Sequence, residues 1–354
     1  MFELAVLWRK KHFHAQCELQ CASLLRINAS HNGAAMLLAE MFFQKQNYEA
    51  AITKFYKLLE KKPNNYLALS NMIKLFRRAG RLCDVPCFIE RAERPNARAL
   101  SHPGLNFCLG LHCRYSNDMV GAIKFFNLAR RDGKWGFLAI INMIELYLNL
   151  DDELRQKPES SGYWHLYKYS IRWDDSATFE CSLESVAIAA QLLKELKAFV
   201  VPDDYSLKIQ VLEAYIFLAS RSRGKIDAAM QIFIDILEKE KDYLPALLGM
   251  STAFMLEKSM TKARNALKRI AKITYSHELA EEFERGYLLL ADIYIQKSKF
   301  DLSEELCGRC LKYNLSCGRA WETMGIIREM EASYKDAADM YERVEPVSET
   351  RSSS

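Results

Sequence analysis

The sequence predicts an all-α fold, a superhelical solenoid of antiparallel helix pairs. Along most of the 354 residues, apolar side chains recur three or four positions apart, which is typical of amphipathic helices. The same combination of small and large residues returns at intervals of about 34 residues, and such a period indicates stacked repeats. No segment has the alternating pattern of a strand, so we expect no sheet.

The repeat is clearest near the C-terminus, in RAWETMGIIREMEASYKDAADMYERV. With Gly318 as position one, Trp321 is fourth, Gly325 eighth, Ala337 twentieth and Tyr341 twenty-fourth. This order of residues on a period of about 34 is the tetratricopeptide repeat (TPR) pattern. Small residues at positions eight and twenty let helices A and B of one repeat approach closely, and large residues fill the space between neighbouring repeats.

Units in this register begin near the N-terminus, where the first residues already read as a helix A, and continue to residue 344. Seven or eight units are in phase, and the chain has neither the asparagine ladder of leucine-rich repeats nor the TPLH turn of ankyrin repeats. The marker positions of the earlier units are Leu4, Ala5 and Trp8; Leu38, Ala39, Ala51 and Phe55; Met72, Ile73 and Ile89; Gly110, Ala122 and Phe126; Ala229 and Phe233; Ser251, Ala263 and Leu267; and Leu290, Ala291, Ser303 and Cys307.

The repeat loses phase in the middle, where DDELRQKPESSGYWHLYKYSIRWDDSATFECS brings acidic, Pro and Ser-Gly punctuation and then clustered aromatic residues. Such a cluster more often packs a long loop against adjacent helices than it forms an exposed binding site. The cluster is Tyr163, Trp164, Tyr167, Tyr169 and Trp173. We predict an N-terminal TPR array at 1–150, an aromatic-rich insertion or linker at 151–181, a C-terminal TPR array at 182–344 and a disordered tail at 345–354.

Charge is distributed unevenly along the chain. Residues 1–134 hold 21 Lys and Arg against 10 Asp and Glu, a net charge of +11, whereas the whole chain has +4. A basic first third suits an acidic partner, RNA or a membrane surface, although scattered basic residues more simply form a solvated helix face. An RNA interface there would use Lys74, Arg77, Arg78 and Arg81.

The sequence has neither a signal peptide nor a run of about 18 apolar residues, so we expect a soluble intracellular protein.

We find no nucleophile, metal or phosphate-binding motif, and we therefore expect no enzyme, no catalytic, cofactor-binding or metal-binding residues, no cofactor and no small-molecule substrate. Cys307 and Cys310 form a lone CxxC in buried helix B positions, which favours core packing over redox or zinc chemistry. The remaining cluster with metal-like spacing also reads more simply as a helix surface and core sulfurs. Its members are His12, His14, Cys17 and Cys21.

The carboxylate clamp of co-chaperone TPR domains is poorly matched. That clamp places Lys and Asn at positions five and nine of one repeat, Asn at six of the next, and basic residues at two and six of the third. Only one of the corresponding residues here, Asn71, fits. The residues at these positions are Met36, Glu40, Asn71, Gly104 and Cys108.

Four stretches in order, KKPNNYLALSNMIKLFRRAGRLCDVP, RALSHPGLNFCLGLHCRY, LLGMSTAFMLEKSMTKARNALKRI and ERGYLLLADIYIQKSKFDLSEELCGRCLKYN, resemble the tetratricopeptide repeat protein twenty-one family. The likeness covers residues 1–341. It implies the large TPR subunit of intraflagellar transport complex A, in a shortened form that lacks the family's N- and C-terminal repeats.

The resemblance implies a non-enzymatic protein-interaction scaffold that acts in retrograde ciliary transport and ciliary receptor trafficking. Its partners would be the other complex A subunits, and its location the cytoplasm and the cilium, at the axoneme and base. The alternative is a cytosolic TPR adaptor or co-chaperone that binds peptide tails. Nucleic acid is the less favoured partner.

Overall fold

A computed structural model describes residues 1–11, 13–28, 31–45, 47–94, 101–148, 183–199, 205–276 and 279–344. Within these ranges the regular elements are helices, and none is a strand. The chain divides into two compact units, Met1–Gly136 and Phe137–Ser354. The predicted insertion at 151–181, its aromatic cluster and the predicted tail at 345–354 lie outside the described residues.

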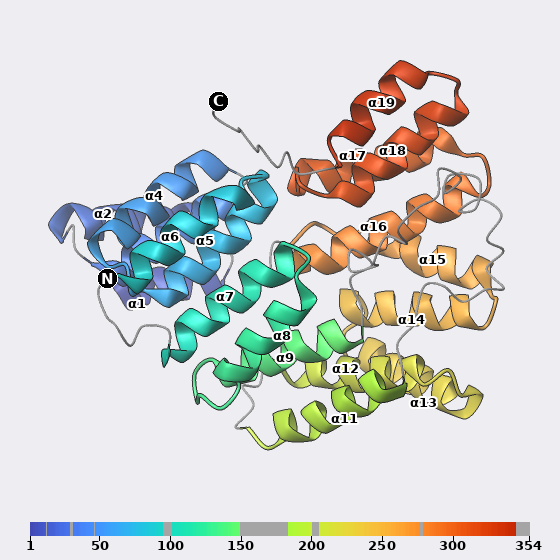
Figure 1. Ribbon diagram of the computed structural model, residues 1–354, viewed down its shortest axis with the longest axis horizontal. Helices are drawn as coiled ribbons and strands as arrows, with labels where there is room; N and C mark the ends of the chain where they lie inside the picture. The colour runs from blue at the N-terminus through green and yellow to red at the C-terminus, as the bar shows by residue number, and fades with distance from the viewer. Residues whose placement is uncertain are drawn as a thin grey trace, which may run out of the picture. The chain divides into compact units, whose positions relative to one another are not determined.

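The first unit is a succession of antiparallel helix pairs (Figure 1). We call the first helix of each pair helix A and the second helix B. The pairs are α1 with α2, α3 with α4, α5 with α6 and α7 with α8. Their bounds are α1 Phe2–Lys10, α2 His14–Ile27, α3 Asn32–Gln44, α4 Tyr48–Lys61, α5 Tyr66–Ala79, the 3-10 turn η1 Leu82–Asp84, α6 Val85–Glu93, α7 Pro103–Tyr115 and α8 Met119–Ala129.

The second unit continues the alternation. Helix α9 begins about one repeat length after α7 and so takes an A position. Helix α11 then precedes four further pairs. These pairs are α12 with α13, α14 with α15, α16 with α17 and α18 with α19. The bounds are α9 Gly136–Tyr147, α11 Leu183–Lys197, α12 Ser206–Ala219, α13 Arg223–Lys239, α14 Leu244–Leu256, α15 Met260–Ile270, α16 Ala280–Ile295, α17 Phe300–Tyr313, α18 Gly318–Met330 and α19 Tyr334–Glu342.

Side-chain caps define several helix starts in the first unit. The side chains of Asn47, Asn65 and Asp118 each accept a hydrogen bond from the backbone N–H three residues later, at 3.2, 3.3 and 2.9 Å. These bonds satisfy donors that the first turn of a helix leaves unpaired. Two of the capped helices, α4 and α8, are B helices, so the caps help to fix where the chain reverses within a repeat.

The predicted small positions are buried between the helices of a pair. Position twenty is occupied by Ala51, Ala122, Ala229, Ala263 and Ala337, of which four are fully buried and the last is 3% exposed. Large residues at position twenty-four are buried as well. Phe55 and Phe126 are fully buried, and Phe107 packs against Phe126 with 5.7 Å between ring centroids. The core of each repeat is therefore the one that the pattern predicts.

Candidate functional site

The A helices of each unit lie beside one another. In the first unit α3 contacts α5 and α5 contacts α7, and in the second α12 contacts α14, α14 contacts α16 and α16 contacts α18. Most B helices instead pack against their own A helix and the A helix of the following repeat, as α4 does with α3 and α5. Consecutive A helices thus form a continuous face in each unit, which we call the A-helix face.

The A helices of the two units have net charges of opposite sign. In the first unit α1 has net charge +1, α3 −1, α5 +3 and α7 +1, a total of +4. In the second, α9 has −1 and α16 has −3, whereas α12, α14 and α18 are neutral, a total of −4. The B helices sum to +1 in each unit. Among the described helices, the difference in charge between the two units therefore comes from the A helices.

A line of polar contacts crosses three A helices of the first unit. Arg9 of α1 forms an ion pair with Glu40 of α3 at 2.5 Å, and the side-chain amide of Asn71 of α5 donates to the other carboxylate oxygen at 3.0 Å. Burial raises the pKa of Glu40, and Arg9, Asn71 and Lys74 offset this effect only in part. Burial of the ionised Glu40 carboxylate therefore costs free energy, and donors from α1 and α5 compensate for part of this cost.

These contacts explain why the carboxylate-clamp pattern fails here. Glu40 stands where the clamp has an Asn, and Asn71, the one matching residue, donates to Glu40. Gly104 and Cys108 are buried in α7. A partner's C-terminal carboxylate would meet the carboxylate of Glu40 where the clamp offers a donor.

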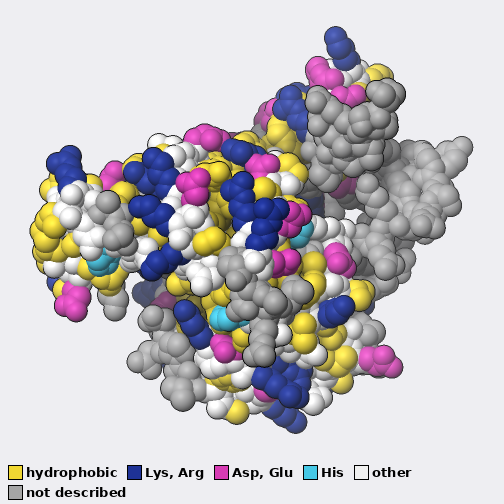
Figure 2. All heavy atoms as spheres, turned by 60° about the vertical axis from the view of Figure 1, so that its left-hand side comes forward, with side chains coloured by type: hydrophobic (Ala, Val, Ile, Leu, Met, Phe, Trp, Pro, Cys, Tyr) yellow, Lys and Arg dark blue, Asp and Glu magenta, His cyan; other side chains and the backbone are white. Residues whose placement is uncertain are grey.

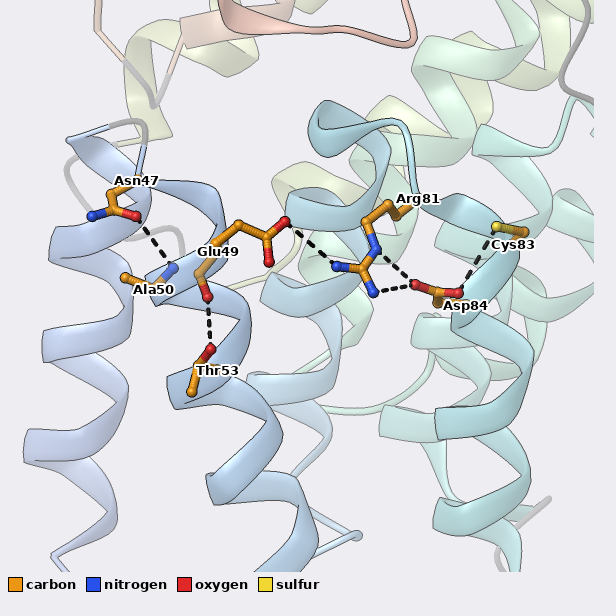
Figure 3. A network of polar contacts seen from close by, with 7 residues as sticks. All are labelled: Asn47, Glu49, Ala50, Thr53, Arg81, Cys83 and Asp84. Carbon is orange, nitrogen blue, oxygen red and sulfur yellow. Dashed lines mark hydrogen bonds and ion pairs between the residues drawn. The ribbon is translucent and has the colours of Figure 1, made fainter.

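The four residues of the predicted RNA interface do not form one continuous exposed basic surface. Lys74 is exposed, whereas Arg78 is 7% exposed. The guanidinium of Arg77 lies 4.5 Å from the ring centroid of Tyr115. Arg81 forms ion pairs with Asp84 at 2.8 Å and Glu49 at 3.5 Å, and these join the loop after α5 to α4 (Figure 3).

The wider surface agrees with this separation. In Figure 2, the coloured Lys and Arg side chains form several small groups with Asp and Glu between them. Phosphate recognition along a nucleic acid benefits from a connected basic path with stacking aromatic residues. The arrangement suits local contacts with acidic side chains better than it suits a nucleic-acid backbone.

The second unit contains a partly buried charged cluster that the sequence analysis did not identify. Lys208 of α12 lies 3.2 Å from Glu145 of α9, and Glu282 of α16 interacts with both. Burial opposes the charge of Lys208, but the carboxylates of Glu145 and Glu282 outweigh it and raise the pKa of Lys208 above its usual value. Burial also raises the pKa of Glu282, against the attraction of Lys208 and Arg285. The cluster connects three A helices.

Further polar contacts join the last repeats. Arg319 of α18 pairs with Asp292 of α16 at 2.6 Å, and Arg328 of α18 pairs with Glu304 of α17. The side-chain amide of Asn314 donates to Glu284 at 2.9 Å, and Asn314 is 2% exposed. The two arginine pairs connect successive repeats and the Asn314 contact joins α16 to the end of α17, so the second unit is held by polar contacts as well as by apolar packing.

The cysteines of the two candidate motifs lie in the core. Cys307 and Cys310 are buried in α17, as predicted, and burial raises the pKa of the Cys307 thiol to about 12. Cys17 and Cys21 are buried in α2, as expected for core sulfurs, and His14 is exposed. His12 lies outside the described residues. In the part of the chain that the structure describes, no three His, Cys, Asp or Glu side chains are grouped so that they could hold a metal ion.

Among the described helices, none is both apolar enough and long enough to cross a bilayer.

Two family models match the chain. One is described as the tetratricopeptide repeat protein 21 C-terminal ARM domain and matches residues 188–354. The other is described as the TT21 fifth ARM repeats domain and matches residues 32–148. Together they cover both sides of the predicted insertion.

Curated relatives that are also named tetratricopeptide repeat protein 21 match nearly the whole chain. Human tetratricopeptide repeat protein 21A is 40% identical over 343 residues, which are 96% of this chain and 25% of that protein. Human tetratricopeptide repeat protein 21B is 42% identical over 343 residues, 97% of this chain and 26% of that protein. A Caenorhabditis elegans homolog is 24% identical over 324 residues, 91% of this chain and 24% of that protein. The chain thus spans about a quarter of the length of the curated relatives that it matches.

Solved structures match at the level of the fold. A tetratricopeptide repeat protein from Parabacteroides merdae has a TM-score of 0.50 and 12% identity, with 84% of this chain and 98% of that chain covered. The human IFIT1 dimer with m7Gppp-AAAA has a TM-score of 0.50 and 13% identity, with 96% of this chain and 80% of that chain covered. Likeness at such identities concerns architecture alone. The predicted TPR solenoid is confirmed.

Proposed function

The chain belongs to the tetratricopeptide repeat protein 21 family, and we propose that it is a non-enzymatic protein-interaction scaffold of intraflagellar transport complex A. In this proposal it contacts other complex A subunits, acts in retrograde ciliary transport and ciliary receptor trafficking, and is found in the cytoplasm and at the axoneme and base of cilia.

The observation that carries the scaffold proposal is the net charge of the A helices, +4 in the first unit and −4 in the second. Repeat proteins bind through extended surfaces built from equivalent helices. Complementary charge on such a surface selects partners and speeds their encounter. Because the A helices of the two units have opposite net charge, one chain could bind an acidic and a basic partner segment at the same time. Binding several partners at once is the function of a scaffold.

The co-chaperone alternative is disfavoured by one contact. A peptide-tail clamp needs donors directed at a carboxylate, and here Asn71 is engaged by Glu40. The ionised side chain of Glu40 would repel a second carboxylate.

Affinity purification of the intact chain from ciliated cells, followed by quantitative mass spectrometry, tests the proposal. We expect enrichment of the other complex A subunits over a tag-only control and over an unrelated TPR protein of similar length. Fluorescence imaging of the same cells should place the chain at the ciliary base and along the axoneme. A folded chain that recovers none of these subunits and stays outside cilia would remove the ciliary assignment.

A further inference from the structure

One side of α1 exposes leucines at positions that later repeats bury. Leu4 and Leu7 stand at positions seven and ten of their repeat and are 43% and 55% exposed. The residues at the same positions of several later A helices are at most 7% exposed. These are Leu38, Met72, Met250 and Leu290 at position seven, and Met41, Leu75, Ala253, Ile293 and Ile327 at position ten. We call the side of α1 that carries Leu4 and Leu7 the α1 end face.

In later repeats, the B helix of the preceding repeat covers the equivalent side of the A helix. Leu38 and Met41 of α3 share one apolar cluster with Cys17 and Cys21 of α2. The same relation joins α16 to α15. No described helix covers the α1 end face in this way. The occupant that fits this face is therefore a helix with the side chains of a TPR B helix.

Helix α19 exposes the matching surface of a B helix. Tyr341 and Val344 stand at positions twenty-four and twenty-seven and are partly exposed. In α4, α13, α15 and α17, each of which packs against the A helix that follows it, the same positions are at most 4% exposed. Their residues are Phe55 and Leu58, Phe233 and Ile236, Leu267 and Ile270, and Cys307 and Cys310. We call the side of α19 that carries Tyr341 and Val344 the α19 end face.

The charges of the two end faces are complementary. Helix α1 has a net charge of +1 and is followed by the exposed Lys11, whereas α19 has a net charge of −2. Asp339 and Glu342 of α19 are both exposed. Two α1 end faces brought together would repel each other, whereas α1 and α19 attract. The charges therefore favour a head-to-tail contact between copies over a head-to-head contact.

We propose that the α1 end face of one chain receives the α19 end face of a second copy, in the packing that a B helix makes with the A helix after it. The apolar positions supply affinity, because their side chains leave water together, and the charges set the direction of the contact. Such a contact is heterologous, so an added copy leaves one end face of each kind free. The inference goes beyond the proposed scaffold function, since it concerns contacts between copies of the chain.

Sedimentation equilibrium of the intact chain tests the self-association. Between about 1 and 100 µM, the weight-average mass should rise with concentration and pass that of a dimer, because the contact does not close on two copies. A mass that levels off at the dimer would overturn the proposal. A chain that stays monomeric would also overturn it, and would leave the α1 end face to a B helix of another protein.

Matched variants locate the contact. Leu7→Glu places a charge on the α1 end face, and Val120→Glu places one on α8 at a position that is 81% exposed. The first should weaken self-association at least about tenfold, and the second should change it less than about twofold. Val344→Glu on the α19 end face should act like Leu7→Glu, with Leu302→Glu on α17 as its control. Equal effects of a variant and its control would overturn the proposed location.

A mixture of the two end-face variants tests the head-to-tail direction. Leu7→Glu keeps the α19 end face and Val344→Glu keeps the α1 end face, so an equimolar mixture has one productive pair of faces. The mixture should form a dimer and nothing larger, although each variant alone is monomeric at the same concentration. If Val344→Glu dimerises alone and the mixture adds nothing, the contact is head-to-head and the proposal is wrong.

Cross-linking of the unaltered chain covers the case in which Leu7→Glu does not fold. Equal amounts of nitrogen-14 and nitrogen-15 chains are mixed and treated with an amine-reactive cross-linker, so that mixed-isotope peptides report contacts between copies. We expect such links between Lys11, directly after α1, and Lys335 of α19, which are both exposed. Mixed-isotope links confined to Lys11 with Lys11, or equally frequent at an exposed lysine elsewhere such as Lys239, would overturn the proposal.

Discussion

The ring of Tyr341 in α19 lies directly against the backbone of Gly325 in α18, so that a Cβ atom on Gly325 would be 2.6 Å from a ring carbon. The hydroxyl of Tyr341 also donates to Glu329 at 3.0 Å. The ring is therefore tied at its far end and cannot swing away without losing that hydrogen bond. The small residue at position eight thus permits the close approach of helices A and B that the TPR pattern predicts, and the residue that it meets is position twenty-four of the same repeat.

Replacing Gly325 by Ala should destabilise the second unit by about 1–3 kcal/mol, because the added methyl group forces the ring or the helices apart. Gly308→Ala in the neighbouring helix α17 is the matched control, since its Cβ would meet nothing within 4 Å. That variant should be neutral or stabilise the chain by up to about 1 kcal/mol, through the better helix propensity of Ala. Urea unfolding of both variants measures the difference, and similar effects would show that the close approach is unimportant.

Glu282 should make the stability of the second unit decline as pH rises. Its pKa is raised in the folded protein, so the folded state binds its proton more tightly than the unfolded chain does. The resulting contribution is complete below the usual value of about 4.5 and is lost as pH rises through the folded pKa.

Because Gln cannot ionise, Glu282→Gln should gain stability relative to the unaltered chain as pH increases over that interval. The free energy of unfolding of both proteins, measured by denaturant titration from pH 4.5 to 8, gives the difference. A difference that is constant with pH would mean that Glu282 is not perturbed by folding.

The pair of Lys208 and Glu145 should contribute more than an exposed ion pair. Lys208→Met leaves the buried carboxylate of Glu145 without its closest cation and should cost about 2 kcal/mol, less than for a fully buried pair because Lys208 keeps 31% side-chain exposure. Glu145→Leu should cost a similar amount. The double variant should recover about 1 kcal/mol or more relative to the sum of the single variants.

The exposed pair of Lys197 and Glu213, at 2.9 Å in the same unit, is the control. Lys197→Met should cost less than about 1 kcal/mol. Thermal or urea unfolding of the unaltered chain and the four variants measures these differences in the free energy of unfolding. If the two lysine variants were equally stable, the buried cluster would have no special role in joining the A helices.

The sequence predicts the repeat core well and this cluster poorly, for a physical reason. Alanines such as Ala51 and phenylalanines such as Phe55 are specified by local periodicity, which the chain repeats many times. Glu145 and Lys208 lie on either side of the predicted insertion, and their contact depends on how repeats stack. One signal was available, because Glu145 is the only charged residue in the otherwise apolar helix α9.

A similar signal was present in the first unit. Arg9, Glu40 and Asn71 follow each other at intervals of 31 residues, close to the repeat length, and alternate in charge or polarity. The sequence showed that the first third is basic, but it could not show how this charge divides between A helices, B helices and connecting segments, since that requires the helix bounds.

Thiol reactivity should separate the exposed cysteines from those in the core. Cys83 and Cys87 are exposed, whereas Cys307 and Cys310 are buried and the pKa of Cys307 is raised to about 12. In native protein at neutral pH, iodoacetamide should label the first two, and the second two should react only after denaturant is added. Peptide mass spectrometry reads each site. Rapid native labelling of Cys307 would contradict its placement in the core.

The most direct test of the account is to reverse charge on an A helix and on a B helix of the same unit, and to measure recovery of complex A subunits from ciliated cells. Lys74→Glu with Arg77→Glu alters α5, and Lys54→Glu with Lys57→Glu alters α4 by the same charge. The account predicts at least about fivefold lower recovery for the α5 variant and recovery within about twofold for the α4 variant, at comparable melting temperatures. Equal recovery with both variants would contradict the claim that the A-helix face binds the partners.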